Sequence, residues 1–231
     1  MTPATHPYRW VMLGGASLVY FCFGLTVAAM APLVNPVARE LGLSHSAMGS
    51  VLGAWQLVYI VSAIPCGALL DRVGPRRALL LAVVIIGTSG VLRSLSEGHM
   101  SLFLAVAVFG LGGPLVSIGG PKLISLWFEG KERGLAMGIF VTGQALGSVA
   151  GLAATNGLAM PLAGGSWRVV LLAYAGIALA SGLVWLAVST GGARRVTDAG
   201  LAAETGRSSL GVFRDLLRIG TVRIVLLMGI C

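Results

Sequence analysis

The sequence predicts an all-α fold, a polytopic helix bundle that spans a membrane. Of the 231 residues, 56% are hydrophobic and 10% are charged, whereas a soluble globular domain carries about 25% charged residues. Apolar runs of roughly 20 residues recur along the chain, and each is long enough to cross about 30 Å of hydrocarbon as a helix. We therefore expect six transmembrane helices within residues 1–188.

Six apolar runs account for this N-terminal domain. They cover approximately residues 10–30, 47–70, 78–95, 101–126, 134–158 and 168–188. The links between them are polar, and they include Asn35-Pro36 with Arg39-Glu40, the turn Glu97-Gly98-His99, and the charged segment 129–133. Two clusters are expected to break the fourth run, namely Gly112-Gly113-Pro114 and Gly119-Gly120-Pro121. Such breaks are tolerated where neighbouring helices satisfy the freed backbone groups.

Lysine and arginine are distributed unequally between the two sets of links. The set that includes the N-terminus holds eleven of them: Arg9, Arg72, Arg76, Arg77, Lys131, Arg133, Arg194, Arg195, Arg207, Arg214 and Arg218. The other set holds Arg39, Arg168 and Arg93, and we expect Arg93 to be an interfacial anchor. Because cytoplasmic loops carry the excess of these residues, both termini are predicted to be cytoplasmic, in a bacterial inner or plasma membrane.

The hydropathy falls after residue 188. Residues 189–220 form a linker rich in Gly, Arg and Ala, and its end places apolar residues on one helical face, which predicts a helix lying on the inner membrane surface. Residues 221–231 begin a seventh apolar run. A run of about ten residues reaches only about 15 Å as a helix, half of the hydrocarbon core. We therefore expect the chain to be a fragment, cut inside a seventh transmembrane helix.

The densest cluster of charge lies between the second and third runs and reads Gly67-Ala-Leu-Leu-Asp71-Arg72-Val-Gly74-Pro75-Arg76-Arg77. Gly67 and Gly74 allow close backbone approach and the positive φ of a tight turn. Asp71 can cap a helix N-terminus or pair with a cation. Arginines alone would set the topology, so an embedded aspartate favours a conformational switch, with a plain topology signal as the alternative.

This cluster resembles the loop between helices 2 and 3 of the major facilitator superfamily of transporters, whose pattern is G-x-L-x-D-R-x-G-[RK]-[RK]. Pro75 departs from that pattern. Further resemblances are the helix 4–5 junction at Trp127-Phe128 and Glu132-Arg133-Gly134, the start of helix 6 at Trp167-Arg168, and the helix-5 glycine motif of the antiporter branches at Gly143, Gly147 and Gly151. Ser148 replaces a proline of that motif and Val106 an arginine of the helix-4 motif, which argues against drug antiport. Residues 120–127 are similar to branches that carry cyanate, nitrate or small organic anions.

The resemblance implies one half of a twelve-helix carrier, built as a 3+3 repeat. A faint internal repeat agrees with this, because Pro32 matches Pro121 and, at the same offset, Ala47-Met48-Gly49 matches Ala136-Met137-Gly138. The implied function is secondary active transport of a small organic or inorganic anion by alternating access, with or without a coupling ion. The implied partners are membrane lipid, the solute and a missing C-terminal half, without which the chain is expected to transport nothing.

Polar side chains near the middle of the runs are candidates for the solute pathway: Tyr20, Gln56, Tyr59, Gln144 and Ser148. Gln56 and Tyr59 share one helix face, and hydrogen bonding between helices of the bundle is the alternative interpretation. Lys122 lies about one turn from the inner end of its run, where it either snorkels to the interface or attracts anions to an inner vestibule. Gly143, Gly147 and Gly151 form a ridge for close helix packing, which the resemblance places against helix 8 of the missing half.

Other function classes find little support. The net charge of +8 suggests nucleic acid, but the basic residues lie in the links, where membrane topology explains them. The three cysteines are isolated in apolar runs, and the three histidines lie in links or tails without a catalytic neighbour. We therefore expect no enzyme, and no cofactor, metal or catalytic residue. The alternatives are a non-transporting half that binds or scaffolds partners and, less favoured, an integral-membrane enzyme.

Overall fold

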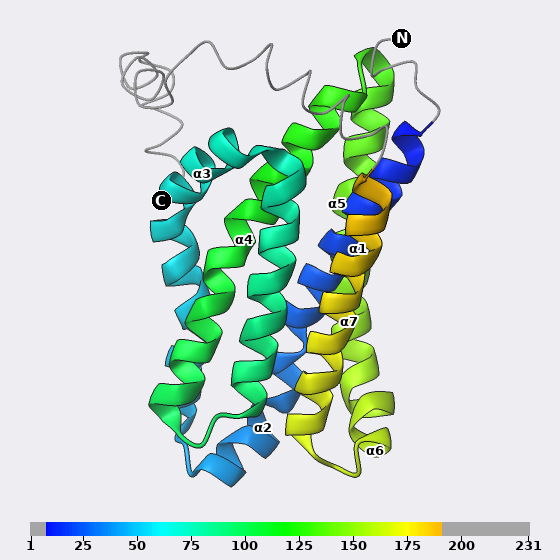
Figure 1. The fold of residues 1–231 in the computed structure, drawn as a ribbon. Helices are drawn as coiled ribbons and strands as arrows, with labels where there is room; N and C mark the ends of the chain where they lie inside the picture. The colour runs from blue at the N-terminus through cyan, green and yellow to red at the C-terminus, as the bar shows by residue number, and fades with distance from the viewer. Residues whose placement is uncertain (1–7, 191–231) are drawn as a thin grey trace.

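The computed structural model describes residues 8–190 and is helical over that range (Figure 1). The main helices are α1 (Arg9–Ala28), α2 (Met30–Leu41), α3 (His45–Ser94), α4 (His99–Trp127), α5 (Gly130–Ala154) and α7 (Trp167–Ser189). A π-helical turn, η2 (Thr155–Ala159), and a short α6 (Met160–Leu162) lie between α5 and α7. Within this part of the chain, five segments are long and apolar enough to cross a membrane: Arg9–Leu41, His45–Ser94, His99–Trp127, Gly130–Leu162 and Trp167–Ser189. The prediction of a polytopic, all-helical membrane bundle is confirmed.

The 50-residue α3 folds back on itself at Gly74. The backbone there has φ 80° and ψ 159°, which glycine adopts without the clash that a Cβ would create. A straight helix of this length would measure about 75 Å, whereas the two arms, 45–73 and 75–94, run in opposite directions in Figure 1. The positive φ predicted for Gly74 is confirmed. Gly67 lies within the first arm and has ordinary helical backbone, so the turn predicted for it is wrong.

The broken fourth helix expected from the sequence is wrong, whereas the polar link between the first two runs is present and is itself helical. The segment around Asn35-Pro36 is helical and belongs to α2. In α4 the helix continues through both glycine–proline clusters. Pro114 deprives the carbonyl of Gly110 of its helical N–H donor, and the Ser62 hydroxyl of α3 donates to that oxygen at 3.2 Å instead. A neighbouring helix thus replaces the lost hydrogen bond, which removes the reason to break.

The glycine ridge of α5 lies against the backbone of α1. A Cβ at Gly143 would lie 2.8 Å from the carbonyl oxygen of Ser17, and a Cβ at Gly151 would lie 2.7 Å from that of Leu25. The ridge therefore packs within this chain and not against a helix of a missing half. Small residues permit this approach because they keep side chains out of the contact.

Figure 1 shows the two ends of the helix bundle. We call one the Gly74 end, where α3 turns, α1 begins and α7 stops. We call the other the Glu40 end, where α2 and α6 lie. The candidate site lies between them, among the helices.

Candidate functional site

A pocket of about 220 Å³ lies among α1, α3, α4 and α5. Its lining consists of Tyr20, Phe23, Trp55, Gln56, Tyr59, Ile60, Ser117 and Gln144. Four of the pathway candidates from the sequence are thereby brought together: Tyr20, Gln56, Tyr59 and Gln144. The Tyr59 hydroxyl and Ser117 Oγ are 2.7 Å apart, so a hydrogen bond joins α3 to α4 at the pocket wall. The pocket therefore offers hydroxyl and amide groups beside aromatic rings.

Aromatic rings form a connected wall at this pocket. Phe109 of α4 stacks on Phe23 with centroids 5.1 Å apart, and it meets Trp55 edge-on at 5.9 Å. Tyr20 stacks on Phe140 at 4.4 Å. Such ring pairs contribute about 0.5–1.5 kcal/mol each beyond the burial of their area. The wall is therefore a stable part of the fold and fixes the shape of the pocket.

Two glycines of α4 make room for the pocket residues on α3. A Cβ at Gly110 would meet the carbonyl oxygen of Trp55, so this glycine lets the two backbones approach each other. A Cβ at Gly113 would lie 2.5 Å from the ring of Tyr59. Gly113 thus leaves space for one side chain, and it positions the Tyr59 hydroxyl next to Ser117.

Arg93, near the end of α3, is buried beside the aromatic wall. It is 1% exposed, and its guanidinium carbon lies 4.9 Å from the centroid of Phe109. Its Nε has no hydrogen-bond partner among the residues that the structure describes. The interfacial position expected for Arg93 is therefore wrong, because the side chain folds inward onto a ring that also contacts Phe23 and Trp55. A cation over a ring face gains about 0.5–2 kcal/mol.

The two remaining pathway candidates lie outside the pocket lining. Lys122 Nζ forms an ion pair with Asp71 Oδ1 at 2.7 Å, which joins α4 to the first arm of α3 near the Gly74 end. Ser148 Oγ donates to the carbonyl oxygen of Gly24 at 3.4 Å and so belongs to the α1–α5 contact. Of the two roles predicted for Asp71, pairing with a cation is confirmed, and the lysine of this pair comes from another helix.

The rest of the charged cluster surrounds the turn of α3. Arg76 Nε donates to Ser189 Oγ at 3.1 Å, and the Arg76 carbonyl oxygen accepts from Trp185 Nε1 at 3.0 Å. These bonds tie the start of the second arm to α7. Arg72 and Arg77 are exposed. The cluster therefore lies where α3 reverses and contacts both α4 and α7.

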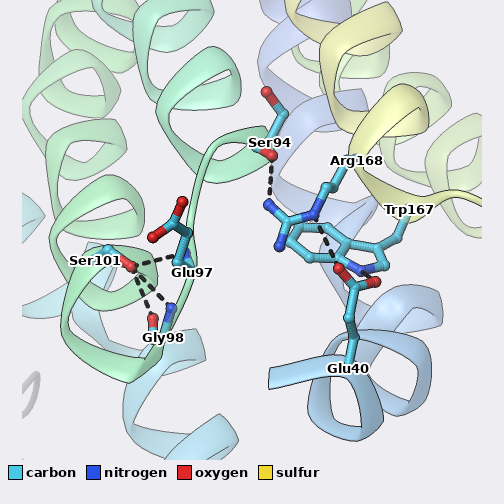
Figure 2. Close-up of polar contacts among 7 residues, drawn as sticks. All are labelled: Glu40, Ser94, Glu97, Gly98, Ser101, Trp167 and Arg168. Atoms are coloured by element: carbon cyan, nitrogen blue, oxygen red, sulfur yellow. Dashed lines mark hydrogen bonds and ion pairs between the residues drawn. The ribbon is translucent and has the colours of Figure 1, made fainter. Parts of the chain in front are cut away.

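A polar cluster holds the Glu40 end together (Figure 2). Glu40 of α2 accepts from Trp167 Nε1 at 2.6 Å and from Arg168 Nε at 3.0 Å. Arg168 Nη1 also donates to the carbonyl oxygen of Ser94, 2.8 Å away at the end of α3. The Arg168 guanidinium lies 4.4 Å from the centroid of Trp167. These two α7 residues, which resemblance singled out, therefore close one end of the bundle and do not line the pocket.

Sequence reasoning missed half of the pocket lining, namely Phe23, Trp55, Ile60 and Ser117. In a chain that is 56% hydrophobic, single apolar side chains carry no signal of their own. One signal was available, because Trp55 and Tyr59 are four residues apart and so share a helix face. Over residues 8–190, no group of three or more His, Cys, Asp or Glu side chains could hold a metal ion.

Comparison with known proteins identifies the family. The sequence profile of the Major Facilitator Superfamily matches residues 16–231. The chain belongs to this superfamily. The resemblance drawn from the motifs is confirmed, and membership places the chain among multi-pass membrane transporters rather than among enzymes.

Several curated relatives are named as transporters of anions or sugar acids. The chain is 33% identical over 165 residues to "Probable anion transporter 3, chloroplastic" of Arabidopsis thaliana, which covers 71% of this chain and 31% of that protein. It is 25% identical over 190 residues to "Probable galactarate/D-glucarate transporter GudP" of Escherichia coli K12, which covers 80% and 41% respectively. The chain spans less than half the length of either relative.

A solved structure shows the same fold. It is the crystal structure of a bacterial homologue of the human lysosomal transporter Spinster, in an inward-facing and unoccupied conformation. The TM-score is 0.74 at 19% sequence identity, over 80% of this chain and 44% of that one. The helices described above therefore share the fold of the matched part of that transporter.

Proposed function

We propose that this chain is the N-terminal half of a secondary active transporter for a small organic or inorganic anion. The observation that carries the proposal is the pocket among α1, α3, α4 and α5, with hydroxyl and amide groups in its lining and a buried arginine beside its wall. Superfamily membership supports the class of activity. The names of the two relatives described above, an anion transporter and a galactarate/D-glucarate transporter, favour an acidic solute.

In this proposal the two arms of α3 each cross the membrane, which gives six crossings in a 3+3 arrangement. The length of α3 supports this, because about 20 residues suffice for one crossing and α3 has 50 with a reversal at Gly74. Tyr8 and Thr190, which bound the described part of the chain, then lie on the side of the Gly74 end. The excess of lysine and arginine assigns this side to the cytoplasm of a bacterial inner membrane, so both termini are proposed to be cytoplasmic. Residues 1–188 are the transmembrane domain. The predicted linker, 189–220, and seventh helix, 221–231, lie almost entirely outside the described residues.

Arg93 gives the pocket its preference for anions. Burial of a cation away from water costs free energy unless a partner compensates for it, and the ring of Phe109 offsets only part of that cost for Arg93. An anion in the neighbouring pocket completes the compensation, because attraction between charges is strong where water is excluded. Tyr59, Ser117 and Gln144 then donate hydrogen bonds that orient the solute.

The second half of the carrier provides the opposite wall of the pathway. Gln56 and Ile60 of the pocket lining are exposed, and Ile60 has 70% of its surface free. Their side of the pocket is where the other half fits, and rocking of one half against the other opens the pocket to each side in turn.

The charged cluster at the Gly74 end acts as a switch between these states. Two ion pairs join helices there, Lys122–Asp71 at 2.7 Å and Arg9–Glu132 at 2.8 Å. Partly exposed pairs of this kind contribute about 0–1 kcal/mol, so they can break and form during transport.

In the protein expressed from its whole reading frame, Asp71→Asn is expected to reduce transport while membrane abundance stays unchanged. Glu129→Gln, an exposed acid at the same end, is the control, and near-normal transport by Asp71→Asn would reduce the cluster to a topology signal.

Uptake into proteoliposomes tests the function itself. The protein expressed from its whole reading frame is reconstituted, and uptake of labelled D-galactonate, D-glucarate, nitrate and neutral D-galactose is compared. We expect saturable uptake of at least one anion and none of galactose above empty liposomes. Uptake of galactose at the same rate as the anions would contradict the proposed solute class, and inertness toward a wide panel of anions by well-folded protein would contradict the proposed function.

A further inference from the structure

We propose that the cleft between the second arm of α3 and α7 binds one anionic phospholipid. Two adjoining pockets make up this cleft, and both are lined by Leu80 and Leu186. One pocket is basic and lies at the Gly74 end, and the other is an apolar groove along the two helices. A charged head joined to an apolar groove has the shape and chemistry of a phospholipid.

The basic pocket, of about 270 Å³, provides the headgroup site. Among the described residues its lining is Arg76, Arg77, Leu80, Leu186 and Ser189, which includes two guanidinium groups. Hydrogen bonds from Arg76 to Ser189 and from Trp185 to the Arg76 carbonyl fix the first arginine in place. Arg77 is exposed and adds a second positive charge. Guanidinium groups match the geometry of phosphate oxygens, so this pocket selects a negatively charged phosphate group.

The apolar groove, of about 350 Å³, provides the acyl-chain site. Its lining is Leu80, Val83, Val84, Gly176, Leu179, Ala180, Gly182, Leu183 and Leu186. The α7 members recur every three or four residues, so the groove follows one face of α7 for about 15 Å. A Cβ at Gly176 would meet no atom within 4 Å, so the groove is open there. Leu183 is 70% exposed beside it.

The joint arrangement favours a lipid over other occupants. A free phosphate would use the arginines but gain nothing from the groove. A second copy of the chain would have to bring an acid to Arg76 and Arg77 together with a narrow apolar ridge. Basic pockets between helices at the membrane surface attract anionic headgroups, and each basic residue contributes about fivefold in affinity.

Native mass spectrometry of the purified protein from its whole reading frame tests the site. Dioleoylphosphatidylglycerol and dioleoylphosphatidylcholine are titrated separately, and the first bound lipid is counted. We expect phosphatidylglycerol to bind at least tenfold more tightly. The double variant Arg76→Gln/Arg77→Gln should weaken that binding roughly thirtyfold, whereas Lys131→Gln/Arg133→Gln, which removes two exposed charges at the same end, should leave it unchanged.

A variant without any change of charge keeps the test independent of arginine effects on folding. Gly176→Leu fills the groove and should weaken binding of both lipids, while Gly157→Leu, at an equally open glycine of η2, should not. Equal binding of the two lipids would overturn the proposal. So would wild-type binding by either test variant, or displacement of the lipid by inorganic phosphate alone.

Discussion

Where α1 meets α5, backbone touches backbone; where α1 faces α3 and α4, aromatic rings surround a pocket. Along the α1–α5 seam, which we define by Gly143, Gly147 and Gly151, an added Cβ would collide with carbonyl oxygens of α1. At the pocket, an added Cβ at Gly113 would meet the movable ring of Tyr59. Glycine therefore has two uses in this domain: it allows close backbone contact at the seam, and it leaves room for a side chain at the pocket.

The two contacts differ in whether the group that an added Cβ would meet can move. A carbonyl oxygen in a helix is fixed by the whole helix, so a clash there must separate α1 from α5. A side chain can rotate, so a clash at the pocket changes the shape of the pocket and leaves the helices in place. We infer that substitutions of the seam glycines mainly lower stability, whereas substitution of Gly113 mainly changes the pocket and its function.

The largest expected effect is that of Gly147→Ala in the seam. The new Cβ would collide with the carbonyl oxygen of Phe21, and overpacking of this kind destabilises proteins by about 1–3 kcal/mol. Thermal unfolding in detergent, followed by tryptophan fluorescence, should show a clear fall in the midpoint. Gly138→Ala on the same helix is the control, because a Cβ there meets nothing within 4 Å; equal midpoints for the two variants would abolish the contrast.

An intermediate effect is expected for Gly113→Ala at the pocket. Its Cβ displaces the Tyr59 ring and with it the hydroxyl that bonds to Ser117. We expect the unfolding midpoint to change little, while solute uptake falls about tenfold, equivalent to about 1.4 kcal/mol. A fall in stability as large as that of Gly147→Ala, with uptake intact, would show that the two glycines have the same role.

The smallest effect is expected for Tyr59→Phe. The variant keeps the ring and removes the hydroxyl 2.7 Å from Ser117 Oγ. A hydrogen bond contributes about 0.5–1.5 kcal/mol, so the apparent affinity for solute should fall only about fivefold. Ser117→Ala removes the other partner and should give a similar change, and the double variant should be no worse than either single one if the hydroxyls act as a pair.

Much of the fold could be predicted because a run of consecutive apolar residues, long enough to cross a bilayer, locates a transmembrane helix without any knowledge of its neighbours. The apolar runs gave the helices to within a few residues, and the dense charge cluster located the reversal at Gly74. The break at Pro114 was predicted wrongly, because helix propensity does not include what a neighbouring helix supplies, such as the Ser62 hydroxyl.

Of the residues that line the pocket, only polar ones could be predicted from the sequence. Gln56, Tyr59, Tyr20 and Gln144 are conspicuous in apolar runs, so sequence alone could propose them. Arg93 was misplaced, since its distance along the helix from the expected interface says nothing about which way the side chain folds. The partners of Lys122 and of the glycine ridge depend on contacts between distant segments, which no local pattern contains.

The central claim is that Arg93, beside the aromatic wall, makes the pocket selective for anions. Isothermal titration calorimetry tests this claim most directly. The transported anion and a neutral analogue of the same size are each titrated into the wild type, into Arg93→Gln and into Arg39→Gln, an exposed control. The account predicts that Arg93→Gln weakens anion binding by roughly tenfold, about 1.4 kcal/mol, without weakening binding of the neutral analogue or lowering the unfolding midpoint. Unchanged anion affinity in Arg93→Gln, or an equal loss for both ligands, would contradict it.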